Sequence, residues 1–347
     1  MTAAQEQTVS ARTAPEVLAW SRCLIEPALR DATAELPAAM RRIAAYHFGW
    51  EDEEGRPTRS GGGKTIRPAL TLLAAEAVGG AAATAMPAAL AVELAHNFSL
   101  LHDDVMDGDH TRRHRATAWR VFGANSAILA GDALLAFAFE ILAADAHPAA
   151  LLAIADLSRA VVQVVEGQSL DMEFERRSDV VLPECVDMAQ RKTAALLGAA
   201  CALGATYGAG TPDQVDRLRR FGERLGLAFQ LVDDLLGIWG DPAVTGKPVH
   251  SDLFNRKKSL PVVAALTSGT PAGAELAMLY HRSRPLSEDE AALAAGLIEV
   301  AGGRSWTVRR AEEVLAGALT ELDAAVPVLQ AGAELRALAR LVTRRDH

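Results

Sequence analysis

Cysteine, aromatic residues and basic runs are all scarce in this 347-residue chain. The three cysteines, Cys23, Cys185 and Cys201, lack metal-ligand spacing, which indicates reduced thiols in a cytoplasmic protein. A net charge of −9 without a long basic run argues against nucleic acid as the main partner. An anionic small ligand stays compatible with this charge, because its site needs only a local group of cations.

A secretory signal and an obvious membrane span are also missing from the sequence. Residues 1–15 are polar, without an apolar core behind a basic start, and we expect them to form a disordered tail. The most membrane-like stretch, Thr193–Gly210, contains four glycines. A buried core helix explains it better than a membrane span, so we expect no stable membrane insertion.

Alanine and leucine are abundant, and the apolar residues follow a helical pattern almost throughout. Half of the residues are hydrophobic, which is enough to bury a sizeable core, while alternating β-branched runs are missing. We therefore predict an all-α fold, a single large helical bundle, with residues 16–347 forming one domain. The predicted helices are Val17–His47, Arg67–Val78, Met86–Met106, Asn125–Ala144, Pro148–Glu175, Leu182–Tyr207, Pro212–Leu236, Leu260–Leu266, Ala272–His281, Glu288–Ala301, Ser305–Ala324 and Ala333–Arg344. Two glycine-containing segments, Glu51–Gly63 and Gly240–Asn255, are predicted to be loops.

Two aspartate clusters lie at the C-terminal ends of predicted apolar helices. The first contains Asp103, Asp104 and Asp107, and the second contains Asp233 and Asp234. On a helix, Asp103 and Asp107 lie about 6 Å apart along the axis and face the same way. A cation between them would relieve their repulsion, and Mg²⁺ prefers one or two carboxylates completed by water and phosphate oxygens. Either cluster alone could be a solvated acidic helix end. Two of them favour facing walls of a cavity that holds a metal-bound diphosphate.

Cations lie close to both clusters in the sequence. Arg112 and Arg113 follow the first cluster, and Lys247 and Lys257 follow the second. The segment GGGKTIRP, which contains Lys64 and Arg67, is a glycine-rich turn that opens a helix, where backbone amides favour anions. A flexible loop with surface cations remains the alternative for this segment taken alone.

Together these motifs resemble the trans-isoprenyl diphosphate synthases, or polyprenyl synthetases, in order and spacing from about Gly61 to Pro261. The resemblance implies an isoprenyl-synthase-type bundle around a central cavity. It also implies a magnesium-dependent enzyme that condenses isopentenyl diphosphate with an allylic diphosphate. Members of this family usually form homodimers, and we expect the same here, although the sequence does not identify the helices in contact.

The resemblance assigns roles to individual residues. The first motif, which holds two magnesium ions, corresponds to Asp103, Asp104 and Asp107, and the second, which holds a third ion, to Asp233 and Asp234. The cations that grip the allylic diphosphate correspond to Arg112, Lys192, Lys247 and Lys257. The isopentenyl diphosphate pocket corresponds to Lys64, Arg67, His96 and Arg113. Polar groups near the developing carbocation correspond to Thr193 and Gln230.

Each of these residues also has a purely structural interpretation. His96 on an apolar helix could be a satisfied core histidine, and Lys192 with Thr193 could lie on an ordinary helix surface. Two departures from the family pattern stand out: Gly237 replaces the third aspartate of the second motif, and Thr65 replaces an arginine. Two alternatives follow for Gly237: the second motif lacks one metal ligand, or Asp241, one turn further on, substitutes for it directly or through water.

Chain length is predicted from the helix that precedes the first motif. Ser99, one turn before Asp103, is small and leaves the channel open on that face. Phe98 points elsewhere on an ideal helix, but the resemblance makes it the floor of the channel. Family members with an aromatic residue five positions before the motif commonly stop near C20. Geranylgeranyl diphosphate is therefore the expected product, and farnesyl diphosphate is the next candidate.

Two rival functions use the same residues. A class I terpene synthase shares the fold and the ionisation chemistry, but it needs no second diphosphate pocket, which would leave Lys64, Arg67, His96 and Arg113 unexplained. A non-catalytic partner subunit would tolerate loss of the first aspartate cluster, which is intact here, and only Gly237 favours that role.

Overall fold

The protein was analysed as a computed structural model that describes residues 11–58, 63, 65–242, 249–280, 284 and 286–343. The fold is all-α, as predicted, with one two-stranded hairpin in the described part of the chain. Its α-helices are α1 (Ala14–Ala34), α2 (Ala38–His47), α3 (Ile66–Ala77), α4 (Met86–Met106), α5 (Ala118–Phe122), α6 (Ala124–Ala144), α7 (Ala150–Arg176), α8 (Leu182–Ala189), α9 (Ala195–Tyr207), α10 (Pro212–Trp239), α12 (Ser251–Phe254), α13 (Leu260–Leu266), α14 (Pro271–Tyr280), α15 (Glu288–Val300), α16 (Gly303–Ala324) and α17 (Leu329–Thr343). The remaining elements are a 3₁₀ turn η1 (Ala82–Ala85), a π turn η2 (Gln190–Ala194) and strands β1 (Thr111–Arg112) and β2 (Arg115–Ala116).

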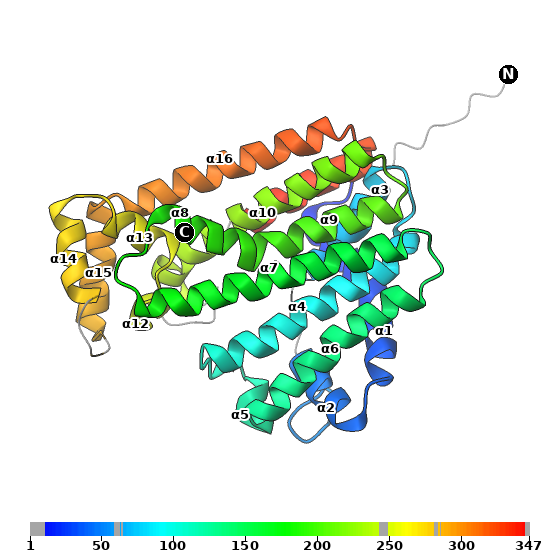
Figure 1. The fold of residues 1–347 in the computed structure, drawn as a ribbon, viewed down its shortest axis with the longest axis horizontal. Helices are drawn as coiled ribbons and strands as arrows, with labels where there is room; N and C mark the ends of the chain where they lie inside the picture. The colour runs from blue at the N-terminus through cyan, green and yellow to red at the C-terminus, as the bar shows by residue number, and fades with distance from the viewer. Residues whose placement is uncertain are drawn as a thin grey trace.

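Helix α9 forms the centre of the bundle (Figure 1). It contacts α3, α4, α7 and α10, and every one of its residues except Thr206 is buried. The prediction that Thr193–Gly210 is a core helix is therefore confirmed for this segment. A helix that is apolar on all sides can be stable in water only when neighbours cover all of its faces.

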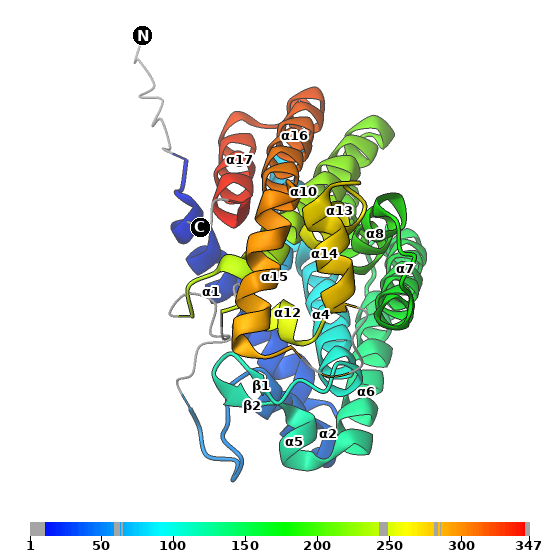
Figure 2. The ribbon, with the colours of Figure 1, turned by 90° about the vertical axis from the view of Figure 1, so that its left-hand side faces the viewer.

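Helix α6 is the segment that composition alone would place in a membrane. Among the helices of the described residues, α6 alone is long and apolar enough to cross a bilayer as a single helix. Its most apolar window has a mean hydropathy of 1.9. Only 33% of that window is buried. Choosing Thr193–Gly210 as the most membrane-like stretch was therefore wrong. Figure 2 shows α6 and α7 along one side of the molecule.

The predicted single helix Val17–His47 was wrong, because the chain forms α1 and α2 with a break between them. Pro37 is the N-cap of α2, and a residue that precedes proline is disfavoured in helical conformation. The break is thus encoded at Leu36–Pro37, although the apolar pattern runs across it.

We expected a disordered tail that reaches residue 15. For residues 11–15, which the structure describes, this expectation was wrong. Helix α1 starts at Ala14, and Thr13 donates its backbone N–H and its hydroxyl to Glu16 at 2.8 and 2.7 Å. Arg12 donates to the fully buried carboxylate of Glu334 at 2.6 Å. This ion pair joins the start of the described chain to α17. Residues 1–10 lie outside the described residues.

Candidate active site

The first aspartate cluster closes α4 beside α7. Gln168 of α7 donates its Nε2–H to Asp107 Oδ1 at 3.1 Å, and Asp107 caps the C-terminus of α4. Burial raises the pKa of Asp103 to about 6, and the negative charges of Asp107 and Asp104 add to this shift. Positive charge from Lys192 opposes it. Burial and the neighbouring carboxylates therefore both disfavour the charged form of Asp103.

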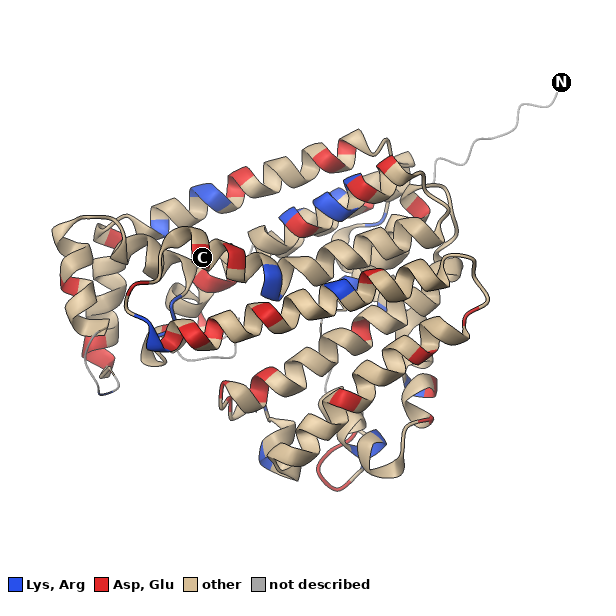
Figure 3. Ribbon diagram, viewed as in Figure 1, with Lys and Arg blue, Asp and Glu red and all other residues tan. Residues whose placement is uncertain are grey.

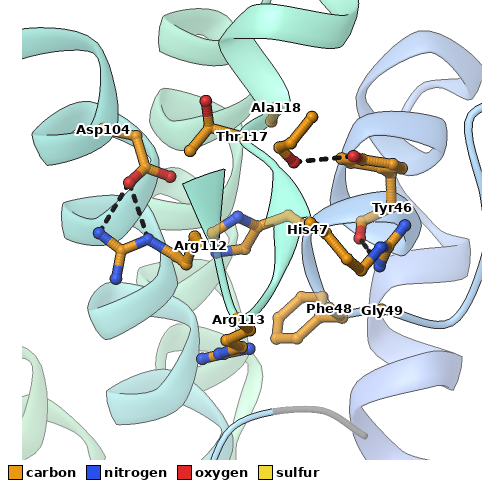
Figure 4. Close-up of a pocket in the computed structure, with 11 residues that line it drawn as sticks. Tyr46, His47, Phe48, Gly49, Asp104, Arg112, Arg113, Thr117 and Ala118 are labelled. Carbon is orange, nitrogen blue, oxygen red and sulfur yellow. Dashed lines mark hydrogen bonds and ion pairs between the residues drawn. The ribbon is translucent and has the colours of Figure 1, made fainter. Parts of the chain in front are cut away.

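Asp104 belongs to the same cluster but faces another direction. Its Oδ1 accepts hydrogen bonds from Nε of Arg112 and lies 2.7 Å from Arg112 Nη2 (Figure 4). Its Oδ2 is buried without a hydrogen-bond partner among the described residues. The structure thus places Asp104 and Arg112 together as an ion pair, whereas Asp103 lines the cavity between α4 and α7.

The second aspartate cluster lies near the C-terminal end of α10. Asp234 is buried, and its oxygens accept hydrogen bonds from Gln230 Nε2 at 2.7 Å and from the backbone N–H of Leu260 at 2.8 Å. Burial raises the pKa of Asp234 to about 7, against the positive charge of Lys257. Asp233, by contrast, is exposed.

Lys257 lies within electrostatic range of both clusters. Burial works against its charge, but the carboxylates of Asp171, Asp234 and Asp107 raise the pKa of Lys257 above its ordinary value. Because Asp107 ends α4 and Asp234 lies on α10, a single lysine interacts with both clusters. In Figure 3, acidic positions gather at the left-hand ends of α4 and α7, with basic positions in the same region.

Asp171 of α7 and the π turn η2 lie next to Lys257 and complete this group of charged residues. Lys192 Nζ donates to Asp171 Oδ2 at 2.6 Å, and Lys257 Nζ lies 4.0 Å from the same oxygen. Thr193 donates its hydroxyl to Gln230 Oε1 at 2.6 Å. Lys192 and Thr193 both lie in η2, and π turns of this kind are frequent at functional sites.

Asp171 and Gln168 were missed in the sequence analysis. They lie three residues apart in the predicted helix Pro148–Glu175 and therefore share a face, which was the available signal. This spacing is a weak signal of function, because two polar residues on one helix face usually lie on an ordinary solvent-exposed surface. They indicate a site only when another charged element packs against them. Only the packing of α7 against α4 and η2 gives the pair its partners.

A separate group of cations surrounds His96 on α4. Burial and the positive charges of Arg67 and Arg113 hold the pKa of His96 well below its ordinary value. Burial lowers the pKa of Arg67 to about 10, although Glu93 opposes this, and Arg67 Nε has no hydrogen-bond partner among the described residues. Buried donors without acceptors are costly, so this group of cations is suited to a bound anion.

Arg113, which belongs to this group of cations, lies in the turn of the β1–β2 hairpin. Strand residue Arg112 pairs with Arg115, and the two turn residues between them, Arg113 and His114, have φ values of 52° and 62°. Positive φ at both positions is the signature of a type I′ turn, which normally uses Asn-Gly or other small polar pairs. A Cβ at Gly63 would lie 2.5 Å from Arg113 Nη2, so the glycine-rich segment leaves room for this guanidinium. The hairpin was not predicted, because its turn lacks the usual residues.

An apolar cavity of about 290 Å³ begins beside Asp103 and runs between α4 and α7. Its lining residues are Phe98, Ser99, His102, Asp103, Met106, Val164, Val165, Gln168, Ser169 and Met172. Phe98 lies five residues before Asp103, about 7.5 Å deeper along the helix axis. The Phe98 ring packs against His102, with 4.6 Å between ring centroids. Ser99 and Phe98 therefore share one cavity with Asp103, although an ideal helix would turn Phe98 away.

The donor set fits magnesium bound together with a phosphate ligand. Among the described residues, no three His, Cys, Asp or Glu side chains converge closely enough to hold a metal ion by themselves. Magnesium typically uses one or two carboxylates and completes its shell with water and substrate phosphates. Asp103, Asp107, Asp233 and Asp234 can supply such carboxylates from two helices. Lys64 and Lys247 lie outside the described residues.

Comparison with known proteins gives one consistent result. The family model for polyprenyl synthetases matches residues 55–297. The (2E,6E)-farnesyl diphosphate synthase of Mycobacterium tuberculosis is 49% identical over 299 residues, which is 85% of this chain and 83% of that protein. The geranylgeranyl diphosphate synthase of the same organism is 44% identical over 321 residues, 92% of this chain and 91% of that protein. The crystal structure of a polyprenyl synthetase from Streptomyces coelicolor matches with a TM-score of 0.91 and 46% identity, over 95% of this chain and 99% of that one.

Proposed function

Because this chain belongs to the polyprenyl synthetase family and is a trans-prenyltransferase, we propose that it joins isopentenyl diphosphate to an allylic diphosphate at the site between α4, α7 and α10. The observation that carries this placement is the position of Lys257, whose Nζ lies 4.0 Å from Asp171 Oδ2 of α7 and within electrostatic range of Asp107 in one aspartate cluster and Asp234 in the other. Dimethylallyl, geranyl and farnesyl diphosphate are the proposed allylic substrates.

The chemical difficulty is breaking an allylic C–O bond, which leaves a diphosphate anion and a carbocation. We assign Lys192, Lys257, Lys247 and Arg112 to the allylic diphosphate, where fixed cations stabilise the growing negative charge. The hydrogen-bonded oxygens of Thr193 and Gln230, 2.6 Å apart, are assigned to the carbocation. The isopentenyl double bond then attacks the cation, and the released diphosphate accepts the proton that is lost. The apolar lining of the cavity disfavours water, which would quench the cation.

The family uses a divalent metal, and we propose that this chain binds three magnesium ions. Two would be held at the first motif, where Asp103 and Asp107 can supply the carboxylates while Asp104, assigned to the same ions from the sequence, is in an ion pair with Arg112. The third would be held by Asp233 and Asp234. Magnesium supplies Lewis-acid stabilisation of the leaving diphosphate when it is bound. The second diphosphate pocket is assigned to Lys64, Arg67, His96 and Arg113, and the unpartnered Nε of Arg67 supports an anion there.

Geranylgeranyl diphosphate is the proposed product, and farnesyl diphosphate is the alternative that the 49% identical relative keeps open. Support for a chain-length limit comes from Phe98, which lies at the deep end of the cavity that begins at Asp103. The test incubates the purified chain with labelled isopentenyl diphosphate and each allylic primer, with magnesium or with EDTA. Geranylgeranyl diphosphate is expected only with magnesium. A hydrocarbon formed from geranylgeranyl diphosphate alone would identify a cyclase instead.

We further propose a cytoplasmic homodimer that forms along α6 and α7. Both helices expose large apolar side chains, namely Leu129, Leu151, Leu152, Val162 and Val165. Val165 is 53% exposed and also lines the cavity, so a second copy would close the cavity wall. The three unpaired cysteines support a reducing compartment.

Light scattering after size-exclusion chromatography tests the dimer. Leu129→Glu and Val162→Glu each place a charge on the proposed contact and should yield a monomer. Val300→Glu on α15 is the matched control, because Val300 is 77% exposed on a different helix. Retention of the dimer in both α6 and α7 variants would contradict the proposed contact.

A further inference from the structure

A reciprocal contact, which we call the Tyr46–Arg115 clasp, fastens the β1–β2 hairpin to the end of α2. The buried Tyr46 of α2 donates its hydroxyl to the carbonyl of Ala116 in β2 at 2.7 Å, and Arg115 Nη1 donates to the carbonyl of Tyr46 at 3.0 Å (Figure 4). Arg115 Nη2 also donates to the carbonyl of Glu51 at 2.8 Å, and its guanidinium lies over the Tyr46 ring, 4.2 Å from the ring centroid. Strand β2 and α2 therefore hold each other through both backbone and side-chain atoms.

The turn of this hairpin has a backbone conformation that it would not keep by itself. Arg113 and His114 have φ values of 52° and 62°. A residue other than glycine is strained in this left-handed region, and it persists there only where the surrounding structure holds it. The clasp begins at Arg115, the residue directly after the turn. It therefore opposes relaxation of the turn and keeps Arg113 in place.

The two adjacent arginines of the hairpin are held in different ways. Arg112 forms an ion pair of 2.7 Å with the buried carboxylate of Asp104. Among the described residues, no hydrogen bond or ion pair holds the Arg113 guanidinium, on which the charge of Glu93 acts only at longer range. The Arg113 guanidinium instead lies against Gly63, where a Cβ would be 2.5 Å from Nη2. The position of Arg113 therefore depends on the backbone of the hairpin, whereas Arg112 has an anchor of its own.

We propose that Tyr46 and Arg115 are positioning residues, which hold Arg113 in the second diphosphate pocket and thereby set the affinity for isopentenyl diphosphate. They act through the backbone of β2 and the turn, not by contact with the substrate. Loosening the clasp lets the turn relax and moves the guanidinium, so its charge-assisted bonds to a phosphate lose their geometry. Binding of the allylic diphosphate changes little, because Arg112 stays paired with Asp104. The inference rests on the proposed assignment of Arg113 to isopentenyl diphosphate.

Steady-state kinetics of the full chain test the clasp, with KM measured separately for isopentenyl diphosphate and for an allylic diphosphate. Tyr46→Phe removes one hydrogen bond and should raise the KM for isopentenyl diphosphate about 5-fold. Arg115→Met removes two hydrogen bonds and the contact with the ring, and should raise this KM about 10-fold or more. Both variants should keep kcat and the allylic KM within about 2-fold of the wild type. Tyr207→Phe on α9 and Arg42→Met, which removes a guanidinium over the Phe122 ring, are the matched controls and should leave both KM values unchanged.

The split between the two KM values separates positioning from a merely structural role. An equal rise in both KM values, or an unchanged KM for isopentenyl diphosphate in Tyr46→Phe and Arg115→Met, would overturn the proposal. Tyr46→Phe decides the question even where Arg115→Met lowers the yield of folded protein, because it removes a single oxygen atom and keeps the ring. A wild type that forms no prenyl diphosphate would instead overturn the proposed function, and this inference with it.

A second test relieves the strain in the turn. Glycine adopts a positive φ without steric cost and is favoured in type I′ turns, so His114→Gly lets the turn keep its shape with less support. The double variant Tyr46→Phe/His114→Gly should bring the KM for isopentenyl diphosphate back to within about 2-fold of the wild type. A loss of packing at α2 would not be repaired by a change in the turn. A double variant with the KM of Tyr46→Phe would therefore contradict a clasp that acts through the turn.

Discussion

Lys192 of the π turn η2 and Asp171 of α7 form an ion pair of 2.6 Å, and Gly167, one turn before Asp171, allows the two elements to approach each other. A Cβ at Gly167 would lie 2.3 Å from the backbone N and 2.7 Å from the Cα of Lys192. These are backbone atoms, so the clash cannot be relieved by rotating a side chain. The position of Lys192 therefore depends on the missing side chain at 167.

Gly167→Ala should push η2 away from α7, because overpacking against backbone typically costs about 1–3 kcal/mol. We expect a lower free energy of unfolding in urea and a lower kcat, since Lys192 and Thr193 move together. Gly296→Ala on α15 is the matched control: a Cβ there meets nothing within 4 Å. This control should stabilise the protein by about 0.5–1 kcal/mol and leave turnover unchanged. An unchanged stability in Gly167→Ala would contradict the close packing of α7 against η2.

Replacing the aspartates tests the metal assignment. Asp103→Ala and Asp233→Ala should each lower kcat by about 100-fold or more, because each removes stabilisation of the leaving diphosphate. Circular dichroism should show that both variants keep their helical content. The assignment fails if both variants turn over at nearly the wild-type rate while magnesium is still required.

The Phe98 side chain should set product length. Phe98→Ala lengthens the cavity beyond its present deep end, so mass spectrometry of the products should show chains longer than those of the wild type. Ser99→Phe is the opposite change, because it fills the same cavity one residue closer to Asp103, and should shorten the product. Unchanged chain length in both variants would remove this cavity as the determinant.

His47 should make the fold sensitive to acid. Burial and the positive charges of Arg113 and Arg112 lower the pKa of His47 to about 3, and its Nε2 has no hydrogen-bond partner among the described residues. The unfolded chain binds this proton near pH 6.5, whereas the folded chain does not until about pH 3. The contribution of neutral His47 is therefore fully present above pH 6.5 and falls by about 1.4 kcal/mol per pH unit below it.

Urea unfolding of the wild type and His47→Gln at pH 7.5 and 5.5 measures this contribution. The difference in free energy of unfolding between the two proteins should change by about 1 kcal/mol in favour of the variant at the lower pH. His110→Gln, a change at an exposed histidine, is the matched control. Parallel curves for the wild type and His47→Gln would contradict a buried neutral His47.

Helices with a complete apolar pattern and clear end signals could be read from the sequence. Met86–Met106 and Leu260–Leu266 were predicted with the bounds that the structure has, and both begin with a proline near their first residue. The prediction failed where the pattern continued through a local break, as at Leu36–Pro37. It also failed where the turn at Arg113 and His114 adopts an unusual backbone conformation.

The sequence by itself determined the all-α class, the family and the helix ends that carry Asp103 and Asp234, because periodicity and motif spacing are local properties of the chain. Only the tertiary structure decided which of these groups meet. Asp171 lies between Lys192 and Lys257, and Tyr46 bonds to the hairpin that carries Arg113, through contacts between segments that the chain brings together only when it folds. Such contacts depend on how helices pack, and a one-dimensional pattern does not encode the distance between two faces.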